Sequence, residues 1–243
     1  MDINLLIQLG YVAAAGLFVF GLKMLGSPDT ARKGNGISAV GMLLAIVAAL
    51  LDQGIVQYEF ILGGMIVGGA IGAVAARSVA MTSMPELVAL FNGVGGAASG
   101  LVGVSALSIA TGNFQYVTII LSILIGGVTF TGSLIAYGKL SEMIGSGAIT
   151  FAGQKFVNGL IVLGILYSAV MFVTTPSDPT WLYAVVGLSL LFGVMVVIPI
   201  GGADMPVVIS LLNSYSGLAA CAAGFAVDNN VLIVAGSLVG PQE

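Results

Sequence analysis

The sequence predicts an all-α fold, a polytopic transmembrane helix bundle. Hydrophobic residues make up 58% of the 243 residues, whereas charged residues make up only 7%. An average soluble domain has roughly 25% charged residues, so this chain cannot cover a water-exposed surface. Long apolar stretches also recur along the whole chain, and about 20 such residues carry a helix across a bilayer. We therefore expect residues 1–243 to form one transmembrane domain.

Eight stretches have the length and composition of a complete span, and a ninth from Val231 to Val239 is too short to cross. That ending predicts a truncated ninth span and a longer natural chain beyond Glu243. The first stretch is not a cleavable signal, because it is long and no basic region precedes it. The complete spans are expected at residues 5–25, 34–51, 60–76, 85–107, 114–137, 156–173, 181–198 and 206–227.

The basic residues predict the orientation of these spans. All of them fall in or beside the odd-numbered connections, whereas four acidic residues lie in or beside the even-numbered ones. By the positive-inside rule the basic side is cytoplasmic, which places the N-terminus outside. Trp181 and Tyr183 then open the seventh span at the outer interface, where aromatic belts occur. The basic residues are Lys23, Arg32, Lys33, Arg77, Lys139 and Lys155, and the acidic ones are Asp52, Glu59, Asp178 and Asp228.

Composition also excludes several classes of site. The net charge is −4 and no basic patch occurs, so nucleic acid is not an expected partner. The chain has no His, so it cannot build a His-based metal site or a His general base by itself. Its single Cys excludes an internal disulfide and a cysteine-rich metal site. No metal and no cofactor are therefore expected in these residues.

The fourth and eighth spans match each other at an offset of 121 residues. Residues 84–93 (MPELVALFNG) align with residues 205–214 (MPVVISLLNS), and Gly96 and Gly103 align with Gly217 and Gly224. Both helices are expected to run outward from the cytoplasm, which makes this a parallel repeat of the kind some transporters show. Each Asn lies seven residues after its Pro, roughly 10 Å into the membrane.

Small polar residues follow one face of three spans. An Asn in hydrocarbon is costly unless it has polar partners or water. Asn92 and Asn213 at matched depth, with Ser133 near the same end of its span, therefore predict a shared polar cavity. The alternative is close helix packing through small residues. The three stripes are Asn92, Gly96, Ser99, Gly100 and Gly103; Ser122, Gly126, Thr129, Gly132 and Ser133; and Ser210, Asn213, Ser214, Gly217 and Cys221.

Two carboxylates flank this cavity at the cytoplasmic starts of the repeat helices. Glu86 and Asp204 either stabilise the helix N-termini, by about 0.3–1 kcal/mol each, or admit protons or ions to the cavity. Asn and Ser cannot carry a proton at physiological pH, but they can orient a water wire.

Glycine runs predict helix packing elsewhere. Gly64, Gly68 and Gly72 form a double small-xxx-small run, and Gly96 and Gly100 repeat the spacing in the fourth span. The Gly145–Ser146–Gly147 segment in the fifth connection is expected to be a flexible connector.

Three blocks of this sequence resemble the proton-translocating nicotinamide nucleotide transhydrogenase family, beta subunit. The main block is Ile200–Val208 (IGGADMPVV) followed by Leu212–Gly217 (LNSYSG). The other two are Met81–Val88 (MTSMPELV), and Val128–Ser133 with Tyr137–Leu140. The resemblance covers the whole chain in segment order.

The resemblance implies a function for this chain. Enzymes of the family are Re/Si-specific and couple hydride transfer from NADH to NADP⁺ with inward proton movement. By resemblance this chain is the beta part of the membrane domain and is not catalytic alone. The resemblance further implies an alpha subunit with the NAD(H) domain, an NADP(H)-binding domain after the ninth helix, a homodimer of the assembly, and a bacterial inner-membrane location among lipids.

Position by position, the resemblance also implies site residues. Ser133 and Asn213 match channel-lining positions, and Asp204 matches a carboxylate on the NADP(H)-domain side. Asn92 stands where bacterial relatives often have a channel His. The departure implies that the titratable group comes from the alpha subunit, from Asp204 or Glu86, or is replaced by water.

Two other readings compete with this one. The parallel repeat and polar cavity also suit a secondary transporter or ion channel for a small solute. A purely structural membrane scaffold is the third. The chain beyond Gly240 would discriminate between them, since a glycine-rich nucleotide-binding domain there supports the transhydrogenase reading.

Overall fold

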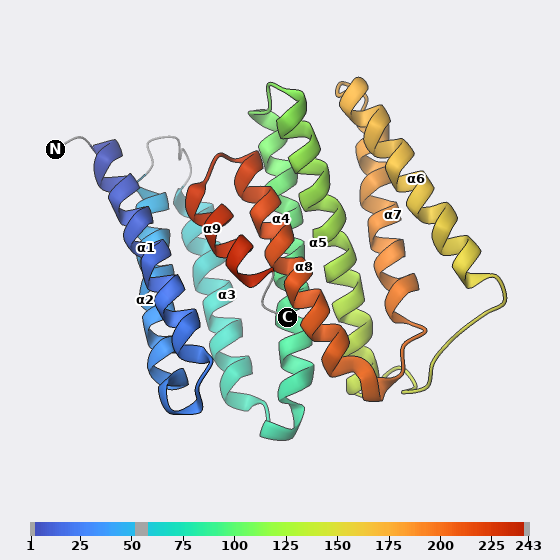
Figure 1. The fold of residues 1–243 in the computed structure, drawn as a ribbon, viewed down its shortest axis with the longest axis horizontal. Helices are drawn as coiled ribbons and strands as arrows, with labels where there is room; N and C mark the ends of the chain where they lie inside the picture. The colour runs from blue at the N-terminus through green and yellow to red at the C-terminus, as the bar shows by residue number, and fades with distance from the viewer. Residues whose placement is uncertain (1–2, 52–57, 241–243) are drawn as a thin grey trace. The chain divides into compact units, whose positions relative to one another are not determined.

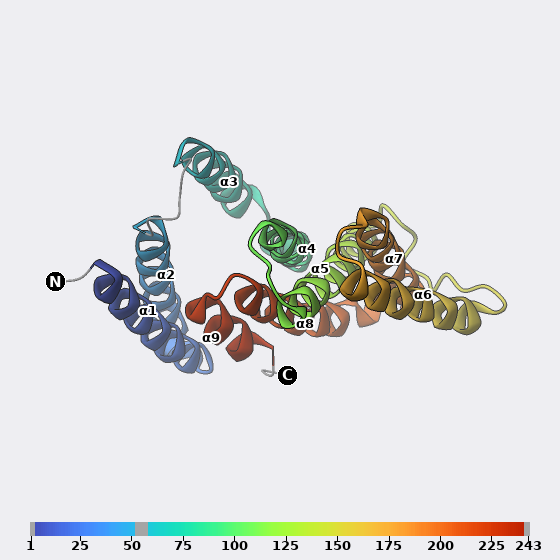
Figure 2. The same ribbon diagram turned by 90° about the horizontal axis from the view of Figure 1, so that it is seen from above.

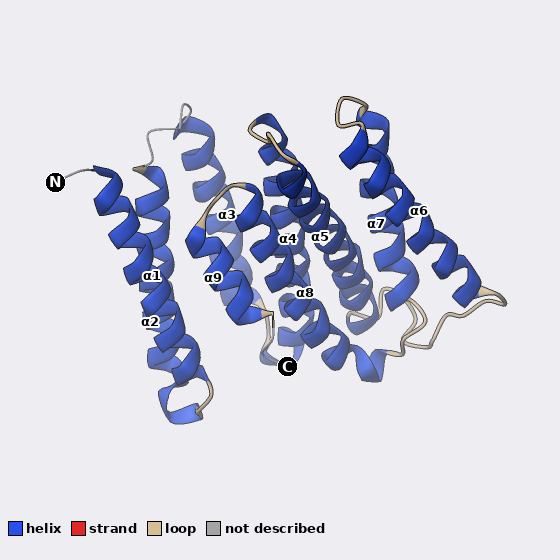
Figure 3. Cartoon of the chain, turned by 45° about the horizontal axis from the view of Figure 1, so that its top comes forward, coloured by secondary structure: helices blue, strands red, loops and turns tan. Residues whose placement is uncertain are grey.

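The computed structural model describes residues 3–51 and 58–240, and within them the secondary structure is helical throughout (Figure 3). Asp52, one of the acidic residues used for the orientation, lies outside the described residues. Eight of the described helices are long and apolar enough to cross a membrane, and Asn230–Val239 forms a shorter apolar helix. This confirms the predicted all-α bundle of eight spans with a short ninth.

The predicted and observed boundaries differ most at the second span. Its helix starts at Pro28 and not at residue 34, because Pro suits the first turn, where no intrahelical N–H bond is needed. The longer spans are α1 (Ile3–Leu25), α2 (Pro28–Leu50), α3 (Tyr58–Ser78), α4 (Met84–Ser105), α5 (Asn113–Leu140), α6 (Gln154–Thr174), α7 (Pro179–Val197) and α8 (Met205–Ala226), followed by α9 (Asn230–Val239).

The chain divides into two compact units, Met1–Ser78 and Val79–Glu243. In the first unit α1 and α2 form a tight hairpin: a Cβ on Gly34 would lie 2.7 Å from the Gly21 carbonyl oxygen. The Thr30 hydroxyl donates to the Met24 carbonyl at 2.6 Å and fastens the turn between them. In contrast, α3 has no buried residue.

The second unit is built around α5. Thirteen residues of this helix are buried, more than in any other described helix, because α4, α7 and α8 all pack against it. Figure 2 shows α5 between these neighbours, with α6 beyond α7. Tyr116, Phe172 and Val185 belong to one apolar core cluster, and Met205 and Leu212 belong to a second one nearer the start of α8.

The two repeat helices are alike in structure. A three-residue 3₁₀ helix, Met81–Ser83 before α4 and Gly202–Asp204 before α8, leads into a 22-residue α-helix with Pro in its first turn. Both helices start at the same end of the unit (Figure 1).

Their glycines also match. A Cβ on Gly96 would lie 2.9 Å from the Gly126 oxygen of α5, and one on Gly217 would lie 2.8 Å from the Gly236 oxygen of α9. Each repeat helix therefore packs backbone to backbone against the helix that follows it.

Candidate functional site

A buried polar junction joins α4, α5 and α8. The Asn92 side-chain amide nitrogen donates to Ser133 Oγ at 3.0 Å, and its oxygen accepts from Ser216 Oγ at 2.6 Å. Ser133 is fully buried, and Asn92 is partly buried. One amide therefore bridges hydroxyls on two other helices, about 12 Å along α4 from its start.

Glycine makes this junction possible. A Cβ on Gly93 would lie 3.1 Å from Ser133 Cβ, so the two helices approach too closely there for larger side chains. One turn further along α4, Gly96 contacts Thr129 in the same way. Of the predicted packing glycines, Gly96 thus lies in the tightest contact. A Cβ added to Gly100 would lie 3.9 Å from Ile123 Cα, which is an ordinary van der Waals distance.

The structure brings together two of the three predicted cavity residues, Asn92 and Ser133. The side chain of Asn213 is exposed in this chain and has no hydrogen bond to a described residue. Ser216 takes its place in the junction. Ser216 lies within the Leu212–Gly217 block, but the sequence repeat could not single it out, because its counterpart at the 121-residue offset is Gly95.

The two carboxylates lie at the starts of α4 and α8. Both helices start at the same end of the unit (Figure 1). Glu86 is partly buried in the first turn of α4, and Asp204 is exposed at the N-cap of α8. The Asp204 side chain makes no capping hydrogen bond.

Lys139 is a residue whose role the sequence did not reveal. The sequence places it on the predicted cytoplasmic side and within the Tyr137–Leu140 block, yet it lies in the last turn of α5 and is only 1% exposed. Its ammonium donates to the carbonyls of Gly147, Ile198 and Ile200 at 2.6–2.9 Å. All three donors of the ammonium are therefore used.

These bonds correct the prediction of a flexible connector at Gly145–Gly147. The Ser146 carbonyl accepts a hydrogen bond from the Gly202 N–H at 2.7 Å, and the Gly147 carbonyl is held by Lys139. The segment is thus fastened to the α7–α8 junction, directly before Asp204. Composition alone suggested flexibility, because partners distant in sequence leave no local signal.

The other polar side chains of α5 differ in their hydrogen bonds. Ser122 donates to the Ser99 carbonyl of α4 at 2.7 Å, and Thr131 donates to the Leu190 carbonyl of α7 at 2.7 Å. Thr129 is fully buried, but its hydroxyl has no hydrogen-bond partner.

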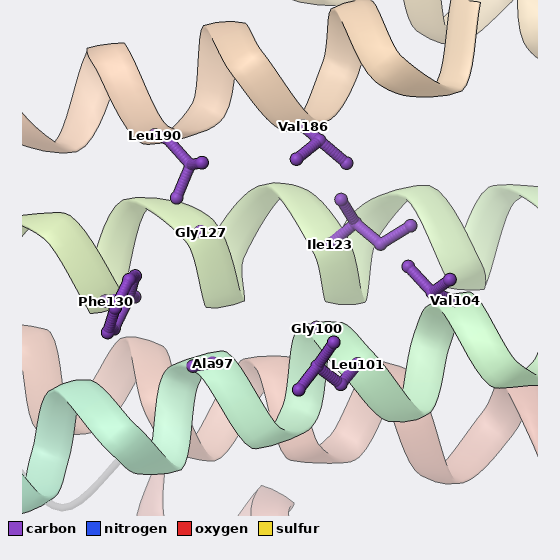
Figure 4. A pocket seen from close by; sticks show the side chains of 9 residues that line it. All are labelled: Ala97, Gly100, Leu101, Val104, Ile123, Gly127, Phe130, Val186 and Leu190. Atoms are coloured by element: carbon purple, nitrogen blue, oxygen red, sulfur yellow. The ribbon is translucent and has the colours of Figure 1, made fainter.

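A groove between α4, α5 and α7 lies beside the α4–α5 contact and holds about 210 Å³. Figure 4 shows small residues, Ala97, Gly100 and Gly127, between larger side chains such as Phe130 and Leu190. Every residue that lines the groove is apolar, so it offers no side chain that could bind or relay a proton.

Among the described residues no group of three His, Cys, Asp or Glu side chains could hold a metal ion. Gly64, Gly68 and Gly72 of α3 are also without close neighbours, since an added Cβ at each would meet nothing within 4 Å. Their predicted role in helix packing remains a prediction.

The fold and the junction define a multi-pass helical membrane protein with hydrogen-bonded polar side chains inside its bundle. Residues 7–242 match the family model of the NAD(P) transhydrogenase beta subunit. The chain belongs to that family, which confirms the resemblance seen in the sequence blocks.

Two curated relatives, each named NAD(P) transhydrogenase subunit beta and each from Rhodospirillum rubrum, are similar to this chain. Each is 40% identical over 242 residues, which covers 95% of this chain and 52% of the relative. The chain thus spans about half the length of the curated relatives that it matches.

Proposed function

We propose that this chain conducts protons across the membrane as part of an NAD(P) transhydrogenase, which couples this movement to hydride transfer from NADH to NADP⁺. The observation that carries the proposal is the Asn92 amide, hydrogen-bonded to Ser133 and Ser216 inside a bundle of this family. This partly buried bridge holds three polar side chains at a similar depth in the bundle. Polar side chains there lower the free-energy cost of moving a proton, which would be high in pure hydrocarbon.

The chemistry of the junction suits a relay through water. Amide and hydroxyl groups do not titrate at physiological pH, but they donate and accept hydrogen bonds and so orient neighbouring waters. Glu86 and Asp204 supply the carboxylates at the end where α4 and α8 start, and Asn213 adds a second amide on α8. With no His in the chain, protons would enter through these carboxylates, through water, or through a group on the alpha subunit.

The remaining parts of the enzyme would come from outside this chain. We propose an alpha subunit with the NAD(H) site, an NADP(H)-binding domain beyond the ninth helix, a homodimer of the whole assembly, and a bacterial cytoplasmic membrane. The described residues offer no strand–loop–helix unit for a dinucleotide. The 243-residue chain alone should therefore neither bind NADP(H) at micromolar affinity in calorimetry nor transfer hydride.

Two fully buried serines give a matched test of the proton pathway. Ser133 belongs to the junction, whereas the Ser189 hydroxyl bonds within its own helix to the Val185 carbonyl. In proteoliposomes of the full assembly, Ser133→Ala removes one hydrogen bond of the junction and Asn92→Leu removes two. Both should lower coupled proton pumping, by about tenfold for a bond that contributes about 1.4 kcal/mol to the transport step. Ser189→Ala should pump normally. Normal pumping by both junction variants would refute the proposal.

Asp204 gives a second test. A carboxylate that couples proton arrival to nucleotide binding must have different interaction energies in the protonated and unprotonated states, and in the nucleotide-bound and nucleotide-free states. Asp204→Asn should therefore reduce coupled transhydrogenation and change NADP(H) affinity together. If both stay normal, Asp204 is only a helix-end charge.

A secondary transporter or ion channel is the second candidate. The repeat favours it, because α4 packs closely against α5 and α8 packs closely against α9 in the same way. It predicts solute or ion flux through the purified chain without any nucleotide. Absence of such flux, together with nucleotide-dependent pumping by the full assembly, would exclude it.

A further inference from the structure

A second groove lies on the outer face of α6 and α7 and differs from the apolar groove of Figure 4 in carrying a charge. It holds about 610 Å³ and begins at Lys155, in the first turn of α6. The other residues that line it are Phe156, Asn158, Gly159, Leu160, Val162, Leu163, Phe192 and Val196.

The polarity of this groove changes along its length. Lys155 and Asn158 lie at the end where α6 starts, whereas Leu160 and Leu163 follow further along the helix. From Lys155 to Leu163 the helix rises about 12 Å. The groove therefore runs from a cationic end to a purely apolar end over a distance that suits the head and upper chain of a lipid.

The polar end of the groove carries a positive charge. Lys155 is exposed and forms no ion pair with a described residue. The Asn158 side-chain oxygen is buried without a hydrogen-bond partner. Gly153 precedes α6 without a side-chain cap, so the positive end of the helix dipole adds to the charge of Lys155.

We propose that this groove binds one anionic glycerophospholipid, such as phosphatidylglycerol. The phosphate pairs with the exposed Lys155 ammonium, and an acyl chain lies along Leu160, Leu163 and Phe192. Charge and lining together favour this occupant: its phosphate complements the positive charge of Lys155, whereas a polar peptide would bury its backbone against Leu160 and Leu163.

The experiment counts lipids retained by the full chain, purified in detergent with added phosphatidylglycerol or phosphatidylcholine, by native mass spectrometry. Lys155→Gln should lower retention of phosphatidylglycerol about fivefold, the effect of one basic residue near an anionic headgroup, and leave phosphatidylcholine unchanged. The control is Lys33→Gln, which removes an exposed lysine of α2 outside the groove.

A second pair of variants tests the acyl-chain part. Gly159 lines the groove and Gly187 of α7 does not, yet an added Cβ at either position meets nothing within 4 Å. Gly159→Leu should fold normally, fill the groove and lower retention of both lipids, whereas Gly187→Leu should retain them. The proposal is overturned if Lys155→Gln and Gly159→Leu retain as much lipid as the unchanged chain, or if the controls lose as much.

Discussion

Glycines on two helices of this chain have different surroundings. In α4, Gly93, Gly96 and Gly103 each lie where an added Cβ would come within 2.9–3.1 Å of α5. In α3, an added Cβ on Gly64, Gly68 or Gly72 would meet nothing within 4 Å. Glycines of the two helices therefore differ: those of α4 lie in close contact with α5, and those of α3 have no described neighbour within 4 Å. Only in α4 does the close approach also place an amide within reach of hydroxyls on two other helices.

The largest expected effect comes from a substitution that breaks the close contact between α4 and α5. Gly96→Leu places a side chain against the Gly126 carbonyl, so α4 and α5 must separate, and the free energy of unfolding should fall by about 3 kcal/mol. Gly68→Leu in α3 should change it by less than about 0.5 kcal/mol. Thermal unfolding of both variants in detergent checks this, and equal stability of the two would contradict the comparison.

The next effect concerns the last turn of α5, where the charged Lys139 side chain, and not a glycine contact, holds neighbouring segments together. Lys139→Met removes the donor to the Gly147, Ile198 and Ile200 carbonyls and should cost about 2 kcal/mol of stability. It should also expose the 141–153 connection to protease. Lys33→Met, at an exposed lysine of α2, is the control. Unchanged protease resistance in Lys139→Met would mean that other contacts fasten the connection.

A smaller effect separates two threonines within the close-packed region. Thr131→Val loses a hydrogen bond to α7 and should destabilise the chain by about 1 kcal/mol. Thr129→Val removes a buried hydroxyl without a partner, so it should be neutral or stabilising. Chemical denaturation compares the two, and a larger loss in Thr129→Val would show that its hydroxyl has a partner.

The smallest effect lies outside the packed spans, at the start of α7. Asp178 accepts a hydrogen bond from the Thr180 N–H at 2.9 Å. Hydrogen bonds from the side chain and backbone of Thr180 hold the pKa of the Asp178 carboxyl below its ordinary value. The stabilisation is therefore complete above the unfolded-state pKa, near 4, and is lost as the pH falls through the lower folded-state pKa. Asp178→Ala should abolish this small acid-dependent loss, measured by thermal unfolding between about pH 5 and pH 2; an unchanged profile would contradict the role of the cap.

Much of the fold could be predicted from the sequence, because crossing a bilayer requires a long apolar helix wherever the chain spans it. The repeat was also visible, since Met-Pro starts and an Asn seven residues later recur in α4 and α8. The hydrogen-bond partners of the buried polar groups were harder to predict from the sequence. Ser216 and Lys139 bond to residues 124 and up to 61 positions away in sequence, and no local spacing encodes such pairs.

The amino-acid sequence by itself determined the helices, their number, the polar stripes and the family. Composition and local periodicity are sufficient for these, because each span satisfies its own backbone hydrogen bonds. Only the tertiary structure decided which small and polar residues meet. Asn92 reaches Ser133 and Ser216 while Asn213 stays exposed, because the crossing of α4, α5 and α8 sets which face of each helix is turned inward. That crossing depends on the close fit of side chains from distant segments, which no single stretch of sequence contains.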